Sequence, residues 1–161
     1  MGDPVFSMIE LDDMRLRCAT WGAGPPDVVF VHEGLGSITQ WGDVPAMVSA
    51  QTGRTVMAYE RRGHGQSEPA PTGAWPDDWM QRESVTLGRV LEAVGATSPV
   101  LVGESDGGTV VLLYAAQRHC NARAVLTLAA HSWLEDVCRE QVLAVRDNAA
   151  AIAAALSRHH R

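Results

Sequence analysis

The chain has 161 residues, of which 46% are hydrophobic and 20% are charged. This composition is typical of one ordinary globular protein and argues against a disordered chain. The formal net charge is −6 at pH 7. The sequence has no basic stripe that would bind nucleic acid and no Lys/Arg-rich helix that would bind an anionic membrane surface. Polyanionic partners are therefore disfavoured, and we expect no nucleic acid and no membrane among the partners.

The first residues lack the basic and long apolar regions of a signal peptide, and no apolar run reaches the ~20 residues that cross a bilayer. We therefore expect a cytoplasmic protein. Cys18, Cys120 and Cys138 are odd in number and widely separated, so we expect them to be reduced and mainly to pack. His159 and His160 are adjacent and would point in different directions on a helix. Neither a metal nor a cofactor is expected.

The apolar pattern predicts strands that alternate with helices along the chain. Two strands around a tight turn come first, at 5–10 and 14–20. Short, continuous apolar runs then predict strands buried on both faces of a parallel sheet, at 28–31, 55–59, 99–102 and 122–129. Helical spacing is found at 44–51, 77–94 and 109–119. Because parallel neighbours need a crossover, this order predicts an α/β fold, with a predominantly parallel sheet and helices on both faces.

Three glycine-rich segments follow three of these buried strands, at 32–37, 60–67 and 103–108. In open α/β sheets, sites form at the carboxyl ends of the strands. Each segment taken alone is an ordinary strand-to-helix turn. Their order predicts that all three lie at one edge of the sheet and form a site there.

The third segment contains Gly103-Glu104-Ser105-Asp106-Gly107, between a buried strand and a helix. A sharp turn in that position lifts the serine above the sheet, and small flanking residues permit the backbone that the turn requires. The amides at the start of the following helix point towards the same place and favour negative charge. We predict Ser105 as the catalytic nucleophile and the backbone N–H of Asp106 as half of an oxyanion hole.

The second donor of the hole is expected from the loop after the preceding central strand, His32-Glu33-Gly34-Leu35-Gly36. Gly34 is the first choice and Leu35 the second. His32 and Glu33, together with His131 after the last predicted strand, are candidate pocket residues.

These segments resemble those of the α/β-hydrolase superfamily, of the serine-nucleophile type. The first is similar to the family's His-Gly-x-Gly loop, and the second, residues 60–67, to its Asp-x-Arg-Gly-x-Gly-x-Ser segment with Glu60 for Asp. The likeness spans about residues 6–131 and implies the N-terminal half of that fold. It implies a core at 1–131 and the start of a helical cap at 132–161. It also implies a structural role for His64.

Two carboxylates depart from the family pattern near the expected chemistry. Glu33 stands where the family most often has glycine, and Glu104 directly precedes the serine. Carboxylates beside a developing oxyanion oppose it unless they point away or meet a cation. Arg61 and Arg62 are candidate partners. Strand alternation favours a structural role for Glu104.

Serine needs a histidine to take its proton and a carboxylate to orient that histidine. In the family these follow the serine, acid before histidine, beyond later strands. Here only a largely helical tail from about residue 137 follows the last predicted strand. We therefore expect the acid and the histidine beyond Arg161 and impaired hydrolysis by this chain. A substitute site from His131 with Glu135 or Asp136 is an alternative, although lining the pocket is the simpler role for His131.

The tail carries an apolar stripe at helical spacing, formed by Val142, Val145, Ala149, Ile152, Ala153 and Leu156. With nothing to cover it, and with an open sheet edge nearby, the stripe predicts self-association.

The leading function is hydrolysis of a small ester, amide or carbon–carbon bond through an acyl-enzyme at Ser105. Epoxide hydrolases and haloalkane dehalogenases share the scaffold but need Asp as nucleophile, so Ser105 argues against them. The second hypothesis is a non-catalytic binding or interaction module on a partial hydrolase fold. A nucleotide-binding domain is disfavoured, because no Gly-x-Gly-x-x-Gly opens a helix after the first parallel strand and no Walker Lys follows a Gly loop.

Overall fold

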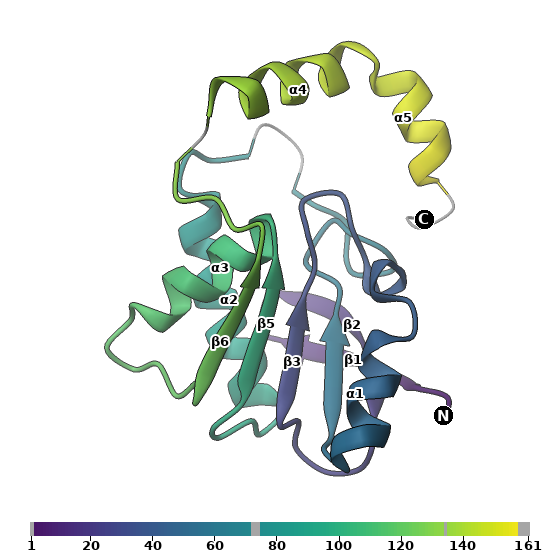
Figure 1. Cartoon of the computed structure of the whole chain (residues 1–161), viewed down its shortest axis with the longest axis vertical. Helices are drawn as coiled ribbons and strands as arrows, with labels where there is room; N and C mark the ends of the chain where they lie inside the picture. The colour runs from purple at the N-terminus through teal and green to yellow at the C-terminus, as the bar shows by residue number, and fades with distance from the viewer. Residues whose placement is uncertain (1, 72–74, 134, 158–161) are drawn as a thin grey trace.

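The computed structural model describes residues 2–71, 75–133 and 135–157 of the chain (Figure 1). Strands and helices alternate after an initial hairpin. The strands are β1 (Val5–Leu11), β2 (Met14–Trp21), β3 (Val28–Val31), β4 (Val56–Tyr59), β5 (Val100–Glu104) and β6 (Ala124–Leu128). The helices are the 3₁₀ turn η1 (Ile38–Trp41), α1 (Val44–Thr52), α2 (Trp79–Ala93), α3 (Asp106–Ala115), α4 (Asp136–Asp147) and α5 (Ala149–Leu156).

The strands form one sheet in the order β1-β2-β4-β3-β5-β6. The first two strands pair antiparallel to each other, and β2 pairs antiparallel to β4. From β4 to β6 all pairs are parallel, and β3 lies between β4 and β5. The carboxyl ends of β3, β4 and β5 therefore lie side by side, as the chain order predicted.

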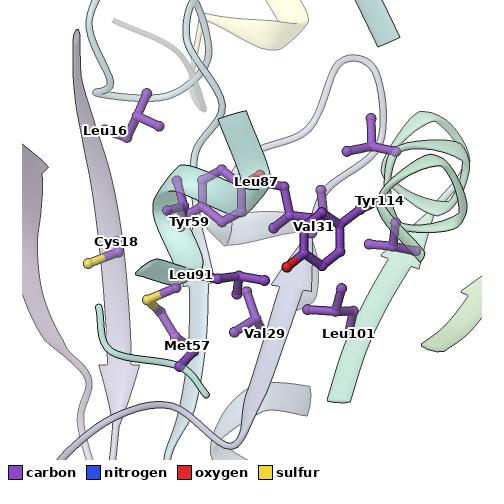
Figure 2. Close-up of a cluster of buried hydrophobic side chains, with 14 of the residues drawn as sticks. Leu16, Cys18, Val29, Val31, Met57, Tyr59, Leu87, Leu91, Leu101 and Tyr114 are labelled. Atoms are coloured by element: carbon purple, nitrogen blue, oxygen red, sulfur yellow. The ribbon is translucent and has the colours of Figure 1, made fainter. Parts of the chain in front are cut away.

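Helices cover both faces of the sheet, which confirms the predicted fold class. One face packs on α2 and α3 through the cluster in Figure 2, in which Val29, Met57 and Leu101 meet Leu87 and Leu91. The other face packs on η1 and α1, through Phe30, Trp41, Val56, Ala58 and Val102 among others. The central strands are apolar on both faces because both faces are buried.

A group of buried polar side chains lies under α2. Tyr59, Arg61 and Glu83 are at most 8% exposed, and each has a side-chain atom without a hydrogen-bond partner among the described residues. Burial raises the pKa of the Glu83 carboxyl, and the charge of Arg61 acts in the opposite direction. Burial also raises the pKa of the Tyr59 hydroxyl. An ionised Glu83 is therefore a cost to folding.

The last strand differs from its predicted burial. β6 was expected to be buried on both faces, but Leu126 is 54% exposed and Leu128 46%. The reason is its place at the sheet edge, where among the described residues it pairs only with β5, while α3 packs against it. Within the same residues, no further strand pairs with its outer edge.

Two helical segments also differ in detail. α3 begins at Asp106, directly after the serine, rather than at Thr109. The expected helical tail is two helices, because α4 ends at Asn148 and α5 starts anew. Figure 1 shows them as an arch above the carboxyl ends of the strands.

Three remaining expectations concern the cysteines, the paired histidines and the membrane. All three cysteines are free thiols. His159 and His160 lie outside the described residues. Within the described ranges, no helix is both long enough and apolar enough to cross a bilayer.

Candidate active site

Ser105 lies at the turn between β5 and α3, with backbone angles φ 50° and ψ −116°. A non-glycine residue rarely adopts such a positive φ, because the conformation costs of order 1–3 kcal/mol and persists only where the surrounding structure imposes it. The N–H of Ser105 donates to the carbonyl oxygen of Leu128 at 2.8 Å, which ties the turn to the end of β6. The backbone is that of a nucleophile elbow.

The glycines of the turn allow close approach of α3 to the sheet. A Cβ at Gly107 would meet the carbonyl oxygens of Val31 and His32, and one at Gly103 would meet the carbonyl of Gly107. Backbone atoms cannot move aside as a flexible side chain can. Glycine is therefore required at position 107 for the start of α3 to lie against the end of β3, and at position 103 for it to lie against β5.

The loop after β3 adjoins the elbow, as predicted. A Cβ on Gly34 would run into the carboxylate of Asp106, so these two residues are in contact. Within the described residues the N–H groups of Gly34 and Asp106 have no hydrogen-bond acceptor. The N–H of Leu35 is different, because it donates to Glu33 Oε2 at 2.8 Å. Of the two donors expected from this loop, Gly34 is the one with a free amide.

The two unusual carboxylates do not meet the predicted arginines. The side-chain amide of Gln40 donates to Glu104 Oε2 at 2.6 Å and accepts from the N–H of Glu33 at 3.3 Å. Gln40 therefore joins the loop after β3 to the elbow. The guanidinium of Arg61 instead donates to the backbone oxygen of Glu33 at 2.9 Å, and Arg62 pairs with Glu68.

The structure differs from expectation at His32, which does not line the cavity. Its side chain is fully buried, and Nε2 accepts from the N–H of Arg61 at 3.0 Å, so Nδ1 is the nitrogen that donates to the oxygen of Glu33. His64 Nε2 lies 2.8 Å from the oxygen of Gly34. Both histidines therefore support the loop, and neither faces the serine.

His131 meets Ser105 directly, with 3.0 Å between its Nε2 and Ser105 Oγ. This is within the reach that a general base needs for the proton of a serine hydroxyl. The structure thus brings the predicted pocket histidine to the predicted nucleophile.

Two features that hold His131 in place were missed from the sequence. Thr109 Oγ1 donates to the backbone oxygen of His131 at 2.8 Å and accepts from its N–H at 3.1 Å. Ala129 adopts a φ of 50°, which turns the chain after β6. An alanine in the sequence does not predict a positive φ, and Thr109 is predicted only to be part of a helix.

Among the residues that the structure describes, no carboxylate hydrogen-bonds to the imidazole of His131. Its Nδ1 has no hydrogen-bond partner in the described part of the chain. Glu135 and Asp136 are exposed at the start of α4 and make no bond to it. The compact three-residue site that these acids would complete is not formed.

A cavity of about 870 Å³ opens above Ser105. Its lining contains the predicted Glu33, Gly34, Leu35, Ser105, Asp106 and His131. The remaining lining comes from the start of α2 and the residue two before it, from α3, from the segment between β6 and α4, and from α4 itself. These residues are Asp77, Trp79, Met80, Gln81, Thr109, Leu113, Ser132, Trp133, Val137, Cys138, Gln141, Val142 and Val145. The size is within the ~300–1,000 Å³ usual for small-molecule sites.

The sheet order and the strand-turn-helix at Ser105 define an α/β-hydrolase architecture. Residues 26–149 match the family model described as the alpha/beta hydrolase fold. The chain therefore belongs to the α/β-hydrolase family.

Relatives within this family carry out different reactions. The chain is 34% identical over 121 residues to the bifunctional esterase/perhydrolase DCH of Acinetobacter calcoaceticus, covering 73% of this chain and 42% of that protein. It is 35% identical over 117 residues to a non-heme haloperoxidase of Rhodococcus erythropolis, covering 71% and 40%. Among solved structures, epoxide hydrolase A from Mycobacterium thermoresistibile is similar, with 26% identity, a TM-score of 0.67, and coverage of 89% and 44%. The chain spans less than half the length of each of these three relatives.

Proposed function

We propose that the chain hydrolyses a small ester, amide or carbon–carbon bond through an acyl-enzyme at Ser105, with His131 as its general base. The observation that carries the proposal is the 3.0 Å contact between Ser105 Oγ and His131 Nε2. Similarity to an esterase supports an acyl substrate. Similarity to an epoxide hydrolase carries less weight here, because the elbow holds serine rather than aspartate.

The steps follow from these positions. The hydroxyl proton of Ser105 passes to Nε2 of His131 while Oγ bonds to the substrate carbonyl carbon, whose oxygen takes the electron pair. The free N–H groups of Gly34 and Asp106 stabilise that oxyanion. When the oxyanion collapses, the leaving group departs with the proton from His131. Water then repeats the sequence and releases the acid product.

We further propose that hydrolysis is slow. Without a carboxylate at Nδ1, the imidazole of His131 is free to turn, and the imidazolium that forms is not stabilised. The carboxylates of Glu33 and Asp106 beside the hole add a charge that opposes the oxyanion. Both effects slow deacylation as well as acylation. With an activated ester, whose good leaving group speeds acylation only, the acyl-enzyme is therefore expected to accumulate.

Covalent labelling tests the proposal. A fluorophosphonate should add once per chain at Ser105, as measured by intact mass. Ser105→Ala should abolish the adduct, while Ser98→Ala, at an exposed serine outside the site, should retain it. Absence of labelling, or labelling that survives Ser105→Ala, would contradict the proposed nucleophile.

A second candidate function is an interaction module, and the uncovered β6 favours it. We propose that two copies pair through this edge, because a free strand with exposed apolar side chains is a template for another strand. The dimer fraction should rise with concentration in sedimentation velocity and fall in Leu126→Lys. If the chain stays monomeric when its concentration is raised 100-fold, this edge is not an interface between copies.

A further inference from the structure

The cavity above Ser105 has two unlike parts, an apolar wall and an acidic rim. We propose that it accepts uncharged, apolar acyl groups of medium length and rejects acyl groups that carry a carboxylate. This inference rests on the proposed acyl-enzyme function and specifies its substrate class.

The apolar wall is contributed by three helices. Val142 and Val145 of α4 face the cavity together with Leu113 of α3 and Met80 of α2. Val142 is 60% exposed, although it lies in this wall. An acyl chain seated on Ser105 and extending towards α4 would cover that surface, and removing apolar surface from water favours binding.

The acidic rim has three carboxylates. Asp106 follows Ser105, Glu33 lies in the loop after β3, and Asp77 lies two residues before the start of α2. No arginine is present in the lining among the residues that the structure describes. The buried guanidinium of Arg61 bonds to the backbone of Glu33 and is not part of the lining.

Like charges brought together in a partly enclosed space repel more strongly than in open water. A substrate carboxylate in this cavity would face three negative side chains without a described cation to pair with. An uncharged chain meets no such cost and still gains the contact with α4. The charge pattern therefore sets the selectivity, and the apolar wall sets the preferred length.

The test compares four fluorophosphonates that share a reactive group and differ in the attached chain. The chains are methyl, hexyl, 5-carboxypentyl and 5-(trimethylammonio)pentyl. Labelling rates of Ser105 are divided by each probe's hydrolysis rate in buffer. The hexyl probe should react at least about tenfold faster than methyl and about tenfold faster than the carboxylated probe.

Variants separate the wall from the rim. Val142→Asp should lower the hexyl-to-methyl ratio, whereas Leu143→Asp, at the next position of α4 but outside the lining, should keep the wild-type ratio. Asp77→Asn should narrow the gap between the hexyl and carboxylated probes. Glu140→Gln, an exposed acid of α4 outside the cavity, should leave that gap as it is.

Each outcome has one meaning. Equal normalised rates for hexyl and carboxylated probes would overturn the selectivity while leaving Ser105 as the nucleophile. A cationic probe that reacts faster than hexyl would overturn the preference for uncharged chains. If no probe labels Ser105, the proposed function fails, and the substrate inference fails with it.

Discussion

Replacing His131 with glutamine tests whether this histidine activates the serine. In a well-studied serine protease, removing the whole triad costs roughly 2 × 10⁶ in turnover, and removing the aspartate alone costs about 3 × 10⁴. Dividing the first factor by the second gives about 70-fold, which is the rate advantage that the histidine still provides when the acid is missing. His131 is in that situation, since Nε2 contacts Ser105 Oγ at 3.0 Å and Nδ1 has no partner in the described ranges.

We therefore expect His131→Gln to slow fluorophosphonate labelling of Ser105 by roughly 10²-fold. The second-order rate constant is measured by intact mass against time. His119→Gln is the matched control, because His119 is exposed and outside the cavity. The melting temperature of each variant should be recorded alongside. A His131→Gln rate within twofold of wild type, with the fold intact, would refute the assignment of His131 as the base.

Three further changes test the loop, the turn and the buried acid. Gln40→Leu removes the hydrogen bonds that join the loop after β3 to Glu104, so the labelling of Ser105 should slow about tenfold, which is ~1.4 kcal/mol in activation free energy. An unchanged labelling rate would show that this link does not position the proposed oxyanion hole. Gly107→Ala should lower the free energy of unfolding by about 1–3 kcal/mol or more in urea titrations, because the added methyl meets backbone oxygens. Gly2→Ala, which meets nothing, should leave it unchanged. Because burial raises the pKa of Glu83, the free energy of unfolding falls as the pH rises from the unfolded-state pKa of about 4.3 through the raised pKa of the folded state. Glu83→Gln should therefore have a higher melting temperature than wild type at pH 8, and the difference between the two melting temperatures should be smaller at pH 4. Equal differences at the two pH values would contradict the raised pKa of Glu83.

The sheet could be predicted because its central strands are buried on both faces and therefore read as continuous apolar runs. The same logic failed for β6, whose run is apolar although the strand lies at an uncovered edge. An apolar run reports what a strand can bury and not which neighbours it has. The start of α3 was placed too late because Gly107 and Gly108 have poor helix propensity, which the close packing of this turn against the ends of the strands overrides.

The site could be predicted where it depends on chain order. Parallel strands bring their carboxyl ends to one edge, so Ser105 and the loop with Gly34 follow from the order of the elements. The contact of His131 with the serine depends instead on the backbone at Ala129 and on the hydroxyl of Thr109. Neither an alanine nor a threonine in the sequence indicates such a role. The hydrogen bond from the Leu35 N–H to Glu33 Oε2 likewise depends on one side-chain conformation, which the sequence does not specify.

The central claim is that Ser105 carries the acyl group, and trapping the acyl-enzyme tests it most directly. The chain is mixed with 4-nitrophenyl hexanoate and quenched in acid, and the adduct is located by peptide fragmentation. We predict one hexanoyl group on the peptide that contains Ser105, absent in Ser105→Ala. A hexanoyl group at another residue, or hydrolysis by Ser105→Ala at the wild-type rate, would contradict the account.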